Sequence, residues 1–387
     1  MDFAFTEEQQ MIRESAESFL ADLSGSEAIR QAMATEQGYD AALWTRICSE
    51  MYWQALHVPE QYGGMGLGFV ELAALFEQMG RFLLCSPFLS NCIATNAILA
   101  AGSDEQKQQW LPIIAEGGTT ATLAYTGRVG GWDADAVTLE YAVQGASVIL
   151  NGGLRYVPDG HTAGLLVVAA REAGTTGASG IGLFLVPADS AGLAASWLPT
   201  MDQTRKQAQI DFSDVEVASE NLMPNMGNAW STLQKVVQLA QVCVAAEQMG
   251  GAQQVLDMSV AYTKEREQFG RTIASFQAIK HKMADMMLKC EVSRSAVYYA
   301  ACVAQEALFD DPASELAHEL ADAAAMAKTY CSDTYFFNAG NAVQLFGGVG
   351  FTWEYDIHLY FKRARSSEAF LGNGAYHRER IASRLLD

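Results

Sequence analysis

Three consecutive stretches with helical periodicity fill most of the second half of this chain, at about residues 230–264, 275–308 and 313–346. In the first stretch apolar residues recur at helical spacing, as at Val236, Ala240 and Val244. At a rise of 1.5 Å per residue, helices of about 30 residues are ~45–50 Å long. Such helices bury their apolar faces against one another, so the sequence predicts a C-terminal four-helix bundle over residues 227–387.

Short β-rich runs replace the long helical patterns between residues 119 and 226. Turns rich in Gly, Asp and Asn separate these runs, which are ATLAYT, AVTLEYAV, SVILNG, GLLVVAA, IGLFLV and AQIDFS. Residues 1–118 have helical patterns again, with N-cap signals at Thr6 and Ser103. We therefore expect an α+β multidomain protein with an N-terminal α-helical domain (1–118), a middle antiparallel β-barrel domain (119–226) and a C-terminal helical bundle domain (227–387).

Composition narrows the classes of partner. The formal net charge of −20 argues against nucleic acids and anionic membrane surfaces, which need clustered Lys and Arg. No apolar run approaches the ~20 residues of a membrane-spanning helix, and the acidic N-terminus lacks the features of a signal peptide. The seven cysteines include no Cys-x-x-Cys pair, which indicates buried free thiols in a reducing cytoplasm. The six histidines form no cluster with ligand spacing, so we predict no metal site.

One carboxylate, Glu247, lies in the apolar part of the first long helix. No other charged residue occurs from Val236 to Gln254. A carboxylate alone in an apolar stretch is costly unless it has a function or a partner. The sequence therefore makes Glu247 a candidate for acid–base chemistry, with an interface or solvent-facing glutamate as the alternative.

Two further segments are informative in combination. Arg266-Glu267-Gln268-Phe269-Gly270, followed by Phe276-Gln277, comes after the first long helix, and Gln344-Leu345-Phe346-Gly347-Gly348-Val349-Gly350 ends the third. Together they resemble the acyl-CoA dehydrogenase family, and the helix–β–helix order extends the resemblance over essentially the whole chain. The resemblance implies FAD bound across a subunit interface, hence at least a dimer, with these residues as contacts: Arg266, Phe269, Phe276 and Gln277 from one subunit, and Gln344, Gly347 and Gly348 from its neighbour. The alternative for Arg266 is a surface salt bridge, because Glu265 and Glu267 flank it.

The same resemblance places Tyr125, Thr126 and Tyr156 beside the flavin. Thr126 keeps the hydroxyl that meets the flavin pyrimidine edge, and Tyr156 keeps an aromatic ring. The family's Glu-Pro is replaced by Gly127-Arg128, a Ser by Trp132, and a hydroxyl residue by Pro158. We expect the flavin to be placed as in the family, with different redox tuning.

The family's base is a glutamate that removes the α-proton of an acyl-CoA thioester, and both of its usual positions are empty here. Most members carry it where this chain has Leu371, whose backbone N–H still matches the donor to the thioester carbonyl. A minority carry it at the position of Ala240, and the neighbouring substrate-binding Arg is Gln241 here. Seven residues turn a helix by about 700° and advance it ~10 Å, so Glu247 lies nearly on the same face two turns later. Glu247 is the predicted base; Glu368, among Lys362, Arg363 and Arg365, is a rival that a salt bridge explains.

The resemblance leads to three functional hypotheses. The first is an FAD-dependent acyl-CoA dehydrogenase that desaturates a bulky, branched or polycyclic acyl-CoA and passes electrons to electron-transfer flavoprotein. It resembles bacterial steroid side-chain dehydrogenases, so it forms either a homo-oligomer or an α2β2 heterotetramer. The second is a non-catalytic partner subunit of such a heteromer, and the third is an oxidase or monooxygenase of the same fold.

Overall fold

The computed structural model describes residues 6–128 and 130–386, and the chain divides into two compact units. The first unit comprises the described residues up to 31, then 68–84, and those from 241 onwards; the second comprises residues 32–67 and 85–240. Along the described residues, no helix combines the length and the apolar character that crossing a membrane requires. All seven cysteines are free thiols, as predicted, and six of them are buried.

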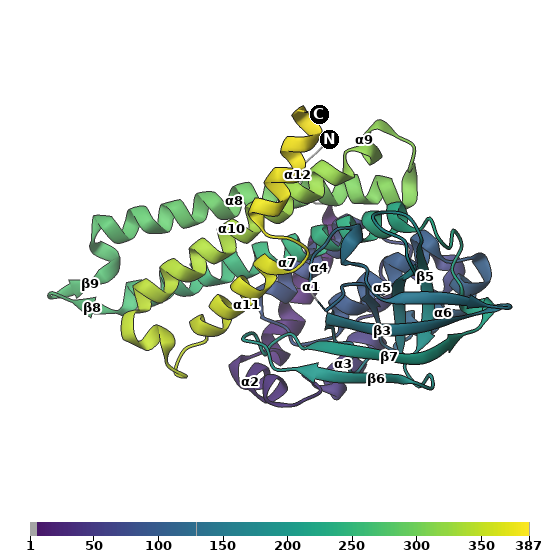
Figure 1. Cartoon of the computed structure of the whole chain (residues 1–387). Coiled ribbons are helices and arrows are strands. Elements are labelled where there is room, and N and C mark those ends of the chain that lie inside the picture. Colours follow the sequence, from purple (N-terminus) through teal and green to yellow (C-terminus); the bar gives the residue numbers. More distant parts are fainter. Residues whose placement is uncertain (1–5, 129, 387) are drawn as a thin grey trace. The chain divides into compact units, whose positions relative to one another are not determined.

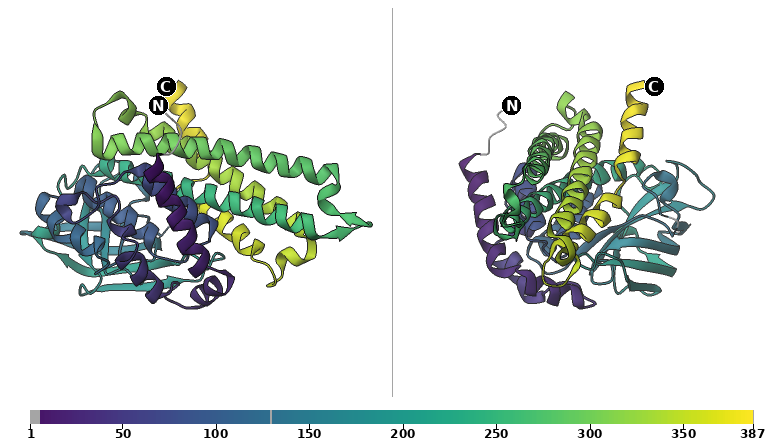
Figure 2. Two further views of the ribbon diagram at one scale, coloured as in Figure 1. Left: turned by 180° about the vertical axis from the view of Figure 1, so that it is seen from behind. Right: turned by 90° about the vertical axis from the view of Figure 1, so that its left-hand side faces the viewer.

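Long helices dominate the first unit, which includes α7 from residue 241 onwards. Helices α7 (Trp230–Glu265), α8 (Gln277–Gln305) and α10 (Leu320–Phe346) run side by side over much of their length (Figures 1 and 2). Helices α11 (Ile357–Ala369) and α12 (Gly374–Leu386) pack against α10. These helices confirm the predicted C-terminal bundle, although the third predicted stretch is divided by a break after the short helix α9 (Glu315–His318).

A small hairpin joins two of the long helices. Strands β8 (Glu267–Gln268) and β9 (Arg271–Thr272) pair in antiparallel fashion between α7 and α8. Figure 1 shows this hairpin beyond the C-terminal end of α7 and the N-terminal end of α8. The short helix η5 (Ile273–Ser275) then leads into α8.

The N-terminal part of the chain is helical, as predicted, and its helices are divided between the two units. Helices α1 (Glu7–Leu23) and α4 (Phe69–Arg81) pack together in the first unit. Helices α3 (Ala41–Ser49), α5 (Phe88–Ala101) and α6 (Asp104–Ala115) belong to the second, and α2 (Ser26–Ala34) lies between α1 and α3 in sequence. Both predicted N-caps are present, because the Thr6 hydroxyl accepts from the Gln9 N–H and the Ser103 hydroxyl from the Gln106 N–H, each at 3.2 Å.

The second unit contains a seven-stranded sheet, in the order β1-β4-β2-β3-β7-β6 with β5 paired to β4. Its strands are β1 (Ala121–Ala124), β2 (Glu140–Gln144), β3 (Ser147–Pro158), β4 (Leu165–Glu172), β5 (Ile181–Pro187), β6 (Leu193–Leu198) and β7 (Gln207–Val217). The expectation of a purely antiparallel barrel needs correction, because β4 pairs in parallel with β1 and with β2. β1 enters from a helix rather than from a hairpin, so no turn forces it to run antiparallel to its neighbour.

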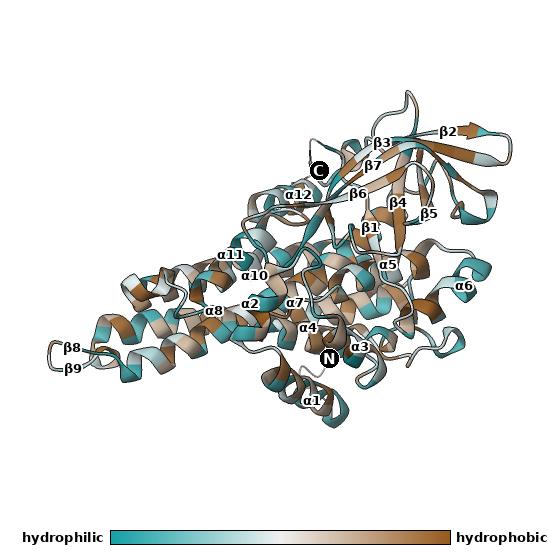
Figure 3. Ribbon diagram, turned by 90° about the horizontal axis from the view of Figure 1, so that it is seen from below, coloured by the Kyte–Doolittle hydropathy of each residue, from teal (hydrophilic) through white to brown (hydrophobic). Residues whose placement is uncertain are grey.

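One apolar core holds the sheet together. Side chains of β4 and β5, such as Val168 and Phe184, share it with those of β3 and β7, such as Leu150 and Ile210. Because these strand pairs are not neighbours in the sheet, the sheet curls around the core. The apolar residues of β4 and β5 are brown in Figure 3. Strand β6 is not predicted by the sequence, because it is an edge strand whose residues are at most half-buried and include the weak strand formers Ala194, Ala195 and Ser196.

Candidate functional site

Glycines bring helix α7 very close to helix α4. A Cβ atom on Gly80 of α4 would lie 1.9 Å from the backbone carbonyl oxygen of Glu247 on α7. Conversely, a Cβ on Gly250 of α7 would lie 1.8 Å from the carbonyl oxygen of Glu77 on α4. Only residues without a side chain permit this approach. The crossing fixes the backbone of α7 at the turn that carries Glu247.

The Glu247 side chain is buried, with 5% of the residue exposed, and it forms an ion pair with Arg363 of α11. Arg363 is itself buried, at 2% exposure. The guanidinium stabilises the ionised carboxylate in surroundings that would otherwise disfavour a charge. Glu247 is therefore neither solvent-facing nor alone: its partner comes from 116 residues further along the chain.

A chain of buried polar side chains lies next to this pair. The amide nitrogen of Gln248 donates to the Ser367 hydroxyl, and its amide oxygen accepts from the Ser332 hydroxyl, both at 3.1 Å. Ser332 in turn accepts from the ammonium group of Lys328 at 3.0 Å. Helices α7, α10 and α11 are thus joined by hydrogen bonds at the level of Glu247.

Leu371, at the family's usual base position, lies in a tight turn after α11. Its φ of 58° is left-handed, as is the φ of 98° at Gly372. The Leu371 side chain is buried, and its carbonyl oxygen accepts a hydrogen bond of 3.1 Å from the side-chain amide of Gln241 on α7. Gln241, which replaces a substrate-binding Arg of the family, therefore holds this turn from α7.

The rival glutamate, Glu368, forms the salt bridge expected for it. Its partner is Arg365, at 2.6 Å, and more than half of the Arg365 side chain is exposed. The Glu368 side chain is 19% exposed, and a pair one helical turn apart with one exposed partner is a common structural contact. The ion pair expected for Glu368 is therefore present, and Glu247 stays the predicted base.

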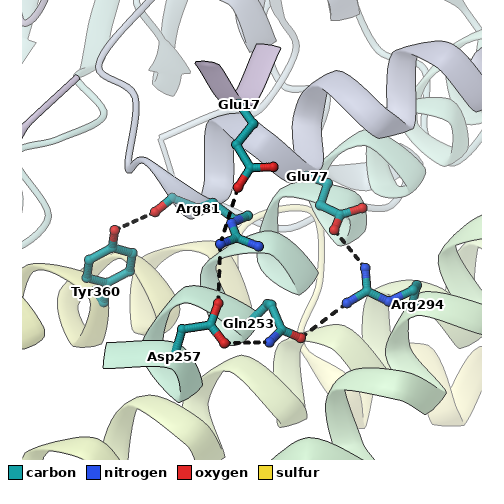
Figure 4. A network of polar contacts seen from close by, with 7 residues as sticks. All are labelled: Glu17, Glu77, Arg81, Gln253, Asp257, Arg294 and Tyr360. Atoms are coloured by element: carbon teal, nitrogen blue, oxygen red, sulfur yellow. Dashed lines mark hydrogen bonds and ion pairs between the residues drawn. The ribbon is translucent and has the colours of Figure 1, made fainter. Parts of the chain in front are cut away.

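A second polar network holds α7 further along its length (Figure 4). Arg81 of α4 pairs with Asp257 of α7 at 3.2 Å, and the Gln253 amide also donates to Asp257, at 2.9 Å. Arg294 of α8 donates to Gln253 at 3.1 Å and pairs with the buried Glu77 of α4 at 2.7 Å. These contacts tie α4, α7 and α8 together without involving Glu247.

The four residues expected to contact the flavin from the hairpin gather at the tip of α7 and α8. Arg266 is exposed, and it makes no ion pair with any other residue that the structure describes, so the salt-bridge alternative does not apply to it. Phe269 is 92% exposed at a left-handed φ of 56°, and its ring meets the Phe276 ring edge-on at 6.3 Å. Gln277 is exposed in the first turn of α8.

The glycine segment lies at the same end of the bundle. The ring of Tyr262, near the end of α7, stacks on that of Phe346, the last residue of α10, at 4.1 Å. Gln344, Gly347 and Gly348 are exposed, and a Cβ on either glycine would meet no atom within 4 Å. An unpaired guanidinium and open backbone at one bundle end suit an anionic diphosphate, as in the expected FAD contacts.

In the second unit, the structure brings two of the three remaining candidates together. The Thr126 carbonyl oxygen accepts from the Arg155 N–H at 3.0 Å, which sets Thr126 beside Tyr156. Tyr156 has a left-handed φ of 59° and is 43% exposed, whereas Tyr125 is buried with its ring 6.3 Å from that of Trp132. Arg128, which replaces a proline of the family, pairs with Asp211 at 2.6 Å.

Sequence reasoning missed two buried cations of the first unit. Arg363 was grouped with its neighbours around Glu368, and no signal distinguished it, since only the fold turns it toward Glu247. Lys328 lies in an otherwise apolar run, AAAMAKTYC, and that isolation was a usable signal of the kind that identified Glu247.

Comparison with known proteins agrees with this geometry. Residues 6–118 match the family model for the acyl-CoA dehydrogenase N-terminal domain, and residues 227–386 match that for the C-terminal domain. Acyl-CoA dehydrogenase IpdE2 of Mycobacterium tuberculosis is 32% identical over 365 residues, which cover 94% of this chain and 93% of that protein. IpdE2 of Mycolicibacterium smegmatis is 30% identical over 367 residues, 95% of each protein.

Solved structures share the fold over nearly the full length. The structure of the electron transferring flavoprotein of Acidaminococcus fermentans contains a chain that is 31% identical with a TM-score of 0.91, and 100% of both chains is covered. The ChsE4–ChsE5 complex of Mycobacterium tuberculosis matches with 26% identity and a TM-score of 0.88, covering 100% of this chain and 99% of that one. The Tcur3481–Tcur3483 steroid ACAD matches with 27% identity and a TM-score of 0.85, covering 98% of each chain.

Proposed function

Because this chain belongs to the acyl-CoA dehydrogenase family, we propose that it is an FAD-dependent oxidoreductase that desaturates a bulky acyl-CoA thioester between its α and β carbons. Glu247 is the base in this proposal. The observation that carries it is a carboxylate buried in α7 and paired with a buried guanidinium, while Leu371 and Ala240 offer no acid. A base must be ionised before it can accept a proton.

The residues of the first unit divide the work around the thioester. Glu247 takes the α-proton, and the backbone N–H of Leu371 donates to the thioester carbonyl, where negative charge develops. Gln241 holds the Leu371 turn by its hydrogen bond to the Leu371 carbonyl. Arg363 favours the charged form of Glu247, so proton uptake by Glu247 requires the ion pair to loosen when substrate is bound.

FAD is held at the bundle end in this proposal. Arg266 and Gln277 of one subunit, with Phe269 and Phe276 beside them, would face the glycine segment Gln344–Gly348 of another. Thr126 and Tyr156, with Tyr125 behind them, would line the ring. When bound, the flavin supplies the acceptor for the β-hydride. The open backbone at Gly347 and Gly348 and the unpaired Arg266 support this assignment.

The acyl group and the partners are proposed from the relatives. Similarity to IpdE2 and to the Tcur3481–Tcur3483 steroid ACAD supports a steroid-derived or other bulky acyl-CoA. Similarity to the two-protein ChsE4–ChsE5 complex supports an α2β2 assembly with a homologous subunit, with a homo-oligomer as the other arrangement. The match within the electron transferring flavoprotein structure supports that protein as the electron acceptor. We place the protein in the cytoplasm.

Anaerobic titration tests the proposal. The purified chain, alone and co-expressed with a homologous subunit, is mixed with steroid-derived and branched acyl-CoAs while the flavin absorbance is followed. We expect bleaching by wild type but not by Glu247→Gln, whereas Glu368→Gln, the matched control, bleaches as wild type does. Normal bleaching by Glu247→Gln would refute the assignment of the base.

A second candidate function rests on one observation, the ion pair that gives Glu247 a structural use. In that case the chain is a non-catalytic partner subunit that completes a flavin site. A chain that is colourless alone, gains FAD only with its homologue, and tolerates Glu247→Gln in the complex would establish this function. Rapid oxygen consumption would instead indicate an oxidase of the same fold.

A further inference from the structure

Lys328 of α10 is fully buried, and none of the carboxylates that the structure describes is its hydrogen-bond partner. None of its surface is exposed. Its ammonium group donates to the Ser332 hydroxyl at 3.0 Å, to the Glu368 carbonyl at 3.1 Å and to the Gly372 carbonyl at 3.0 Å. A protonated lysine has three N–H donors, so all three are used.

The two carbonyl groups bracket the turn that contains Leu371. Glu368 lies in the last turn of α11, and Gly372 follows Leu371 directly. A leucine at positive φ is strained, because its Cβ crowds the backbone. Such a conformation persists only where the surroundings hold it. Here side chains from two other helices hold three carbonyls of the turn: Lys328 binds those of Glu368 and Gly372, and Gln241 binds that of Leu371.

The same ammonium group is linked to the neighbour of the proposed base. Ser332, which accepts from Lys328, donates to Gln248 at 3.1 Å, and Gln248 follows Glu247 in α7. Lys328 therefore lies between the Leu371 turn and the turn of α7 that carries Glu247. Lys328 makes hydrogen bonds both to the Leu371 turn and to this polar chain.

We propose that Lys328 is a positioning residue, whose ammonium group holds the Glu368–Gly372 turn so that the Leu371 N–H and the Glu247 carboxylate keep a fixed separation. This inference rests on the proposed acyl-CoA chemistry, and it assigns the fixed geometry of the thioester site to a side chain that does not touch the substrate. Loss of the ammonium group would free two carbonyls and let the strained turn relax.

The protonation state of Lys328 sets how many of these bonds exist. Burial lowers the pKa of Lys328 to about 7, against the opposing effect of Cys331, Glu368 and Asp333. His377 of α12 faces the same turn, and burial lowers its pKa to about 4, so it is neutral near pH 7. Above pH 7 a neutral Lys328 keeps only two donors for three acceptors.

Hydrogen exchange of the turn amides, residues 369–373, tests the positioning role without requiring turnover. In Lys328→Met we expect exchange of these amides to accelerate at least tenfold, since a charged donor is lost from two carbonyls. In Lys289→Met, which removes a half-buried lysine of α8, we expect no change. Unchanged exchange in Lys328→Met would overturn the proposal.

Kinetics test the link to the thioester. With a wild type that desaturates acyl-CoA, we expect Lys328→Met to lower kcat about tenfold or more with little change in KM. Faster exchange of the turn amides with normal turnover would show that the order of the turn does not affect the reaction, and would refute the link. If the wild type has no acyl-CoA activity but exchange responds, the positioning role stands and the proposed function fails.

If the Lys328→Met variant does not fold, the pH dependence of hydrogen exchange in the wild type tests the proposal instead. Between pH 6 and 8.5 protection of the turn amides, corrected for intrinsic exchange, should fall relative to that of the α10 core amides. A constant ratio would overturn the role of the ammonium group.

Discussion

The ion pair between Glu247 and Arg363 predicts strongly coupled mutations. The two side chains are 6% and 3% exposed, so each charge depends on the other for compensation. Removing one partner of a buried pair leaves an uncompensated charge and costs about 3–5 kcal/mol. Replacing both partners by neutral groups removes that penalty, and buried pairs replaced in this way are often near neutral in stability. We therefore expect Glu247→Gln and Arg363→Met each to destabilise the protein by about 3–5 kcal/mol.

The double variant distinguishes coupling from two separate defects. If the single effects were independent, they would sum to about 6–10 kcal/mol; with a compensating pair the double variant loses no more than either single variant. The assay is urea unfolding followed by tryptophan fluorescence and by far-UV circular dichroism, at equal protein and FAD concentrations. Coincidence of the two transitions is required before the free energies are compared.

An exposed pair on the same unit is the matched control. Arg378 and Asp333 lie 2.8 Å apart with side chains that are 58% and 45% exposed. The double-mutant cycle of Arg378→Met and Asp333→Asn should give a coupling energy below about 1 kcal/mol. Additive losses in the Glu247–Arg363 cycle would refute the reasoning, because the carboxylate would then be compensated by something other than Arg363.

Three further predictions concern the surroundings of this pair. Gly250→Ala should destabilise the protein by about 1–3 kcal/mol in thermal unfolding, because the new Cβ would clash with the Glu77 carbonyl. The control, Gly340→Ala in α10, has open space around the new Cβ and should be neutral or slightly stabilising. His377 has a pKa lowered from 6.5 to about 4 by burial, so between these values only the unfolded state binds the proton. Stability should fall by about 3 kcal/mol as the pH falls from 6.5 to 4, and His377→Gln should flatten this slope in urea unfolding. Lys328 has a pKa lowered from 10.5 to about 7, so above pH 7 the unfolded state binds one proton more than the folded state. The free energy of unfolding should therefore rise by about 1–2 kcal/mol from pH 7 to 8.5. An equal rise in Lys328→Met, which lacks this group, would contradict the prediction.

The long helices were predictable because their signal is repeated many times. The first predicted stretch, 230–264, lies within one residue of the observed α7, Trp230–Glu265, since nearly ten turns carry the same pattern. The strands were harder. Parallel pairing of β4 with β1 and β2 joins segments about 30–45 residues apart, and no local pattern encodes which segments meet. The domain limits at 118 and 226 stay predictions.

At the candidate site, the sequence pointed to single residues but not to pairs. Glu247 was recognisable because no charge surrounds it along the helix. Its partner was not, because Arg363 lies beside Lys362 and Arg365 and near Glu368, where a local salt bridge is the simplest explanation. In the structure Arg365 forms the ion pair with Glu368, whereas the side chain of Arg363 is buried and pairs with Glu247. The contacts of Arg266, Phe269, Phe276, Gln277, Gln344, Gly347 and Gly348, and of Tyr125, Thr126 and Tyr156, with FAD stay predictions.

The presence of Arg363 changes what proton transfer to Glu247 would cost. Neutralising the carboxylate does not remove all of the attraction to the guanidinium, because the negative charge moves to the thioester enolate.

At an effective dielectric constant of 20, opposite unit charges attract by about 4 kcal/mol at 4 Å and about 3 kcal/mol at 6 Å. If the enolate forms within ~6 Å of Arg363, the penalty is therefore about 1 kcal/mol, roughly a factor of five in rate. If it forms beyond the reach of Arg363, the penalty approaches the whole pair energy of about 3–5 kcal/mol, which would slow the step by a factor of roughly 10²–10⁴. A buried Glu–Arg pair is thus compatible with a base only where the guanidinium can exchange one anion for another. The position of the α-carbon relative to Arg363, more than the burial of Glu247, decides whether this carboxylate can do the chemistry.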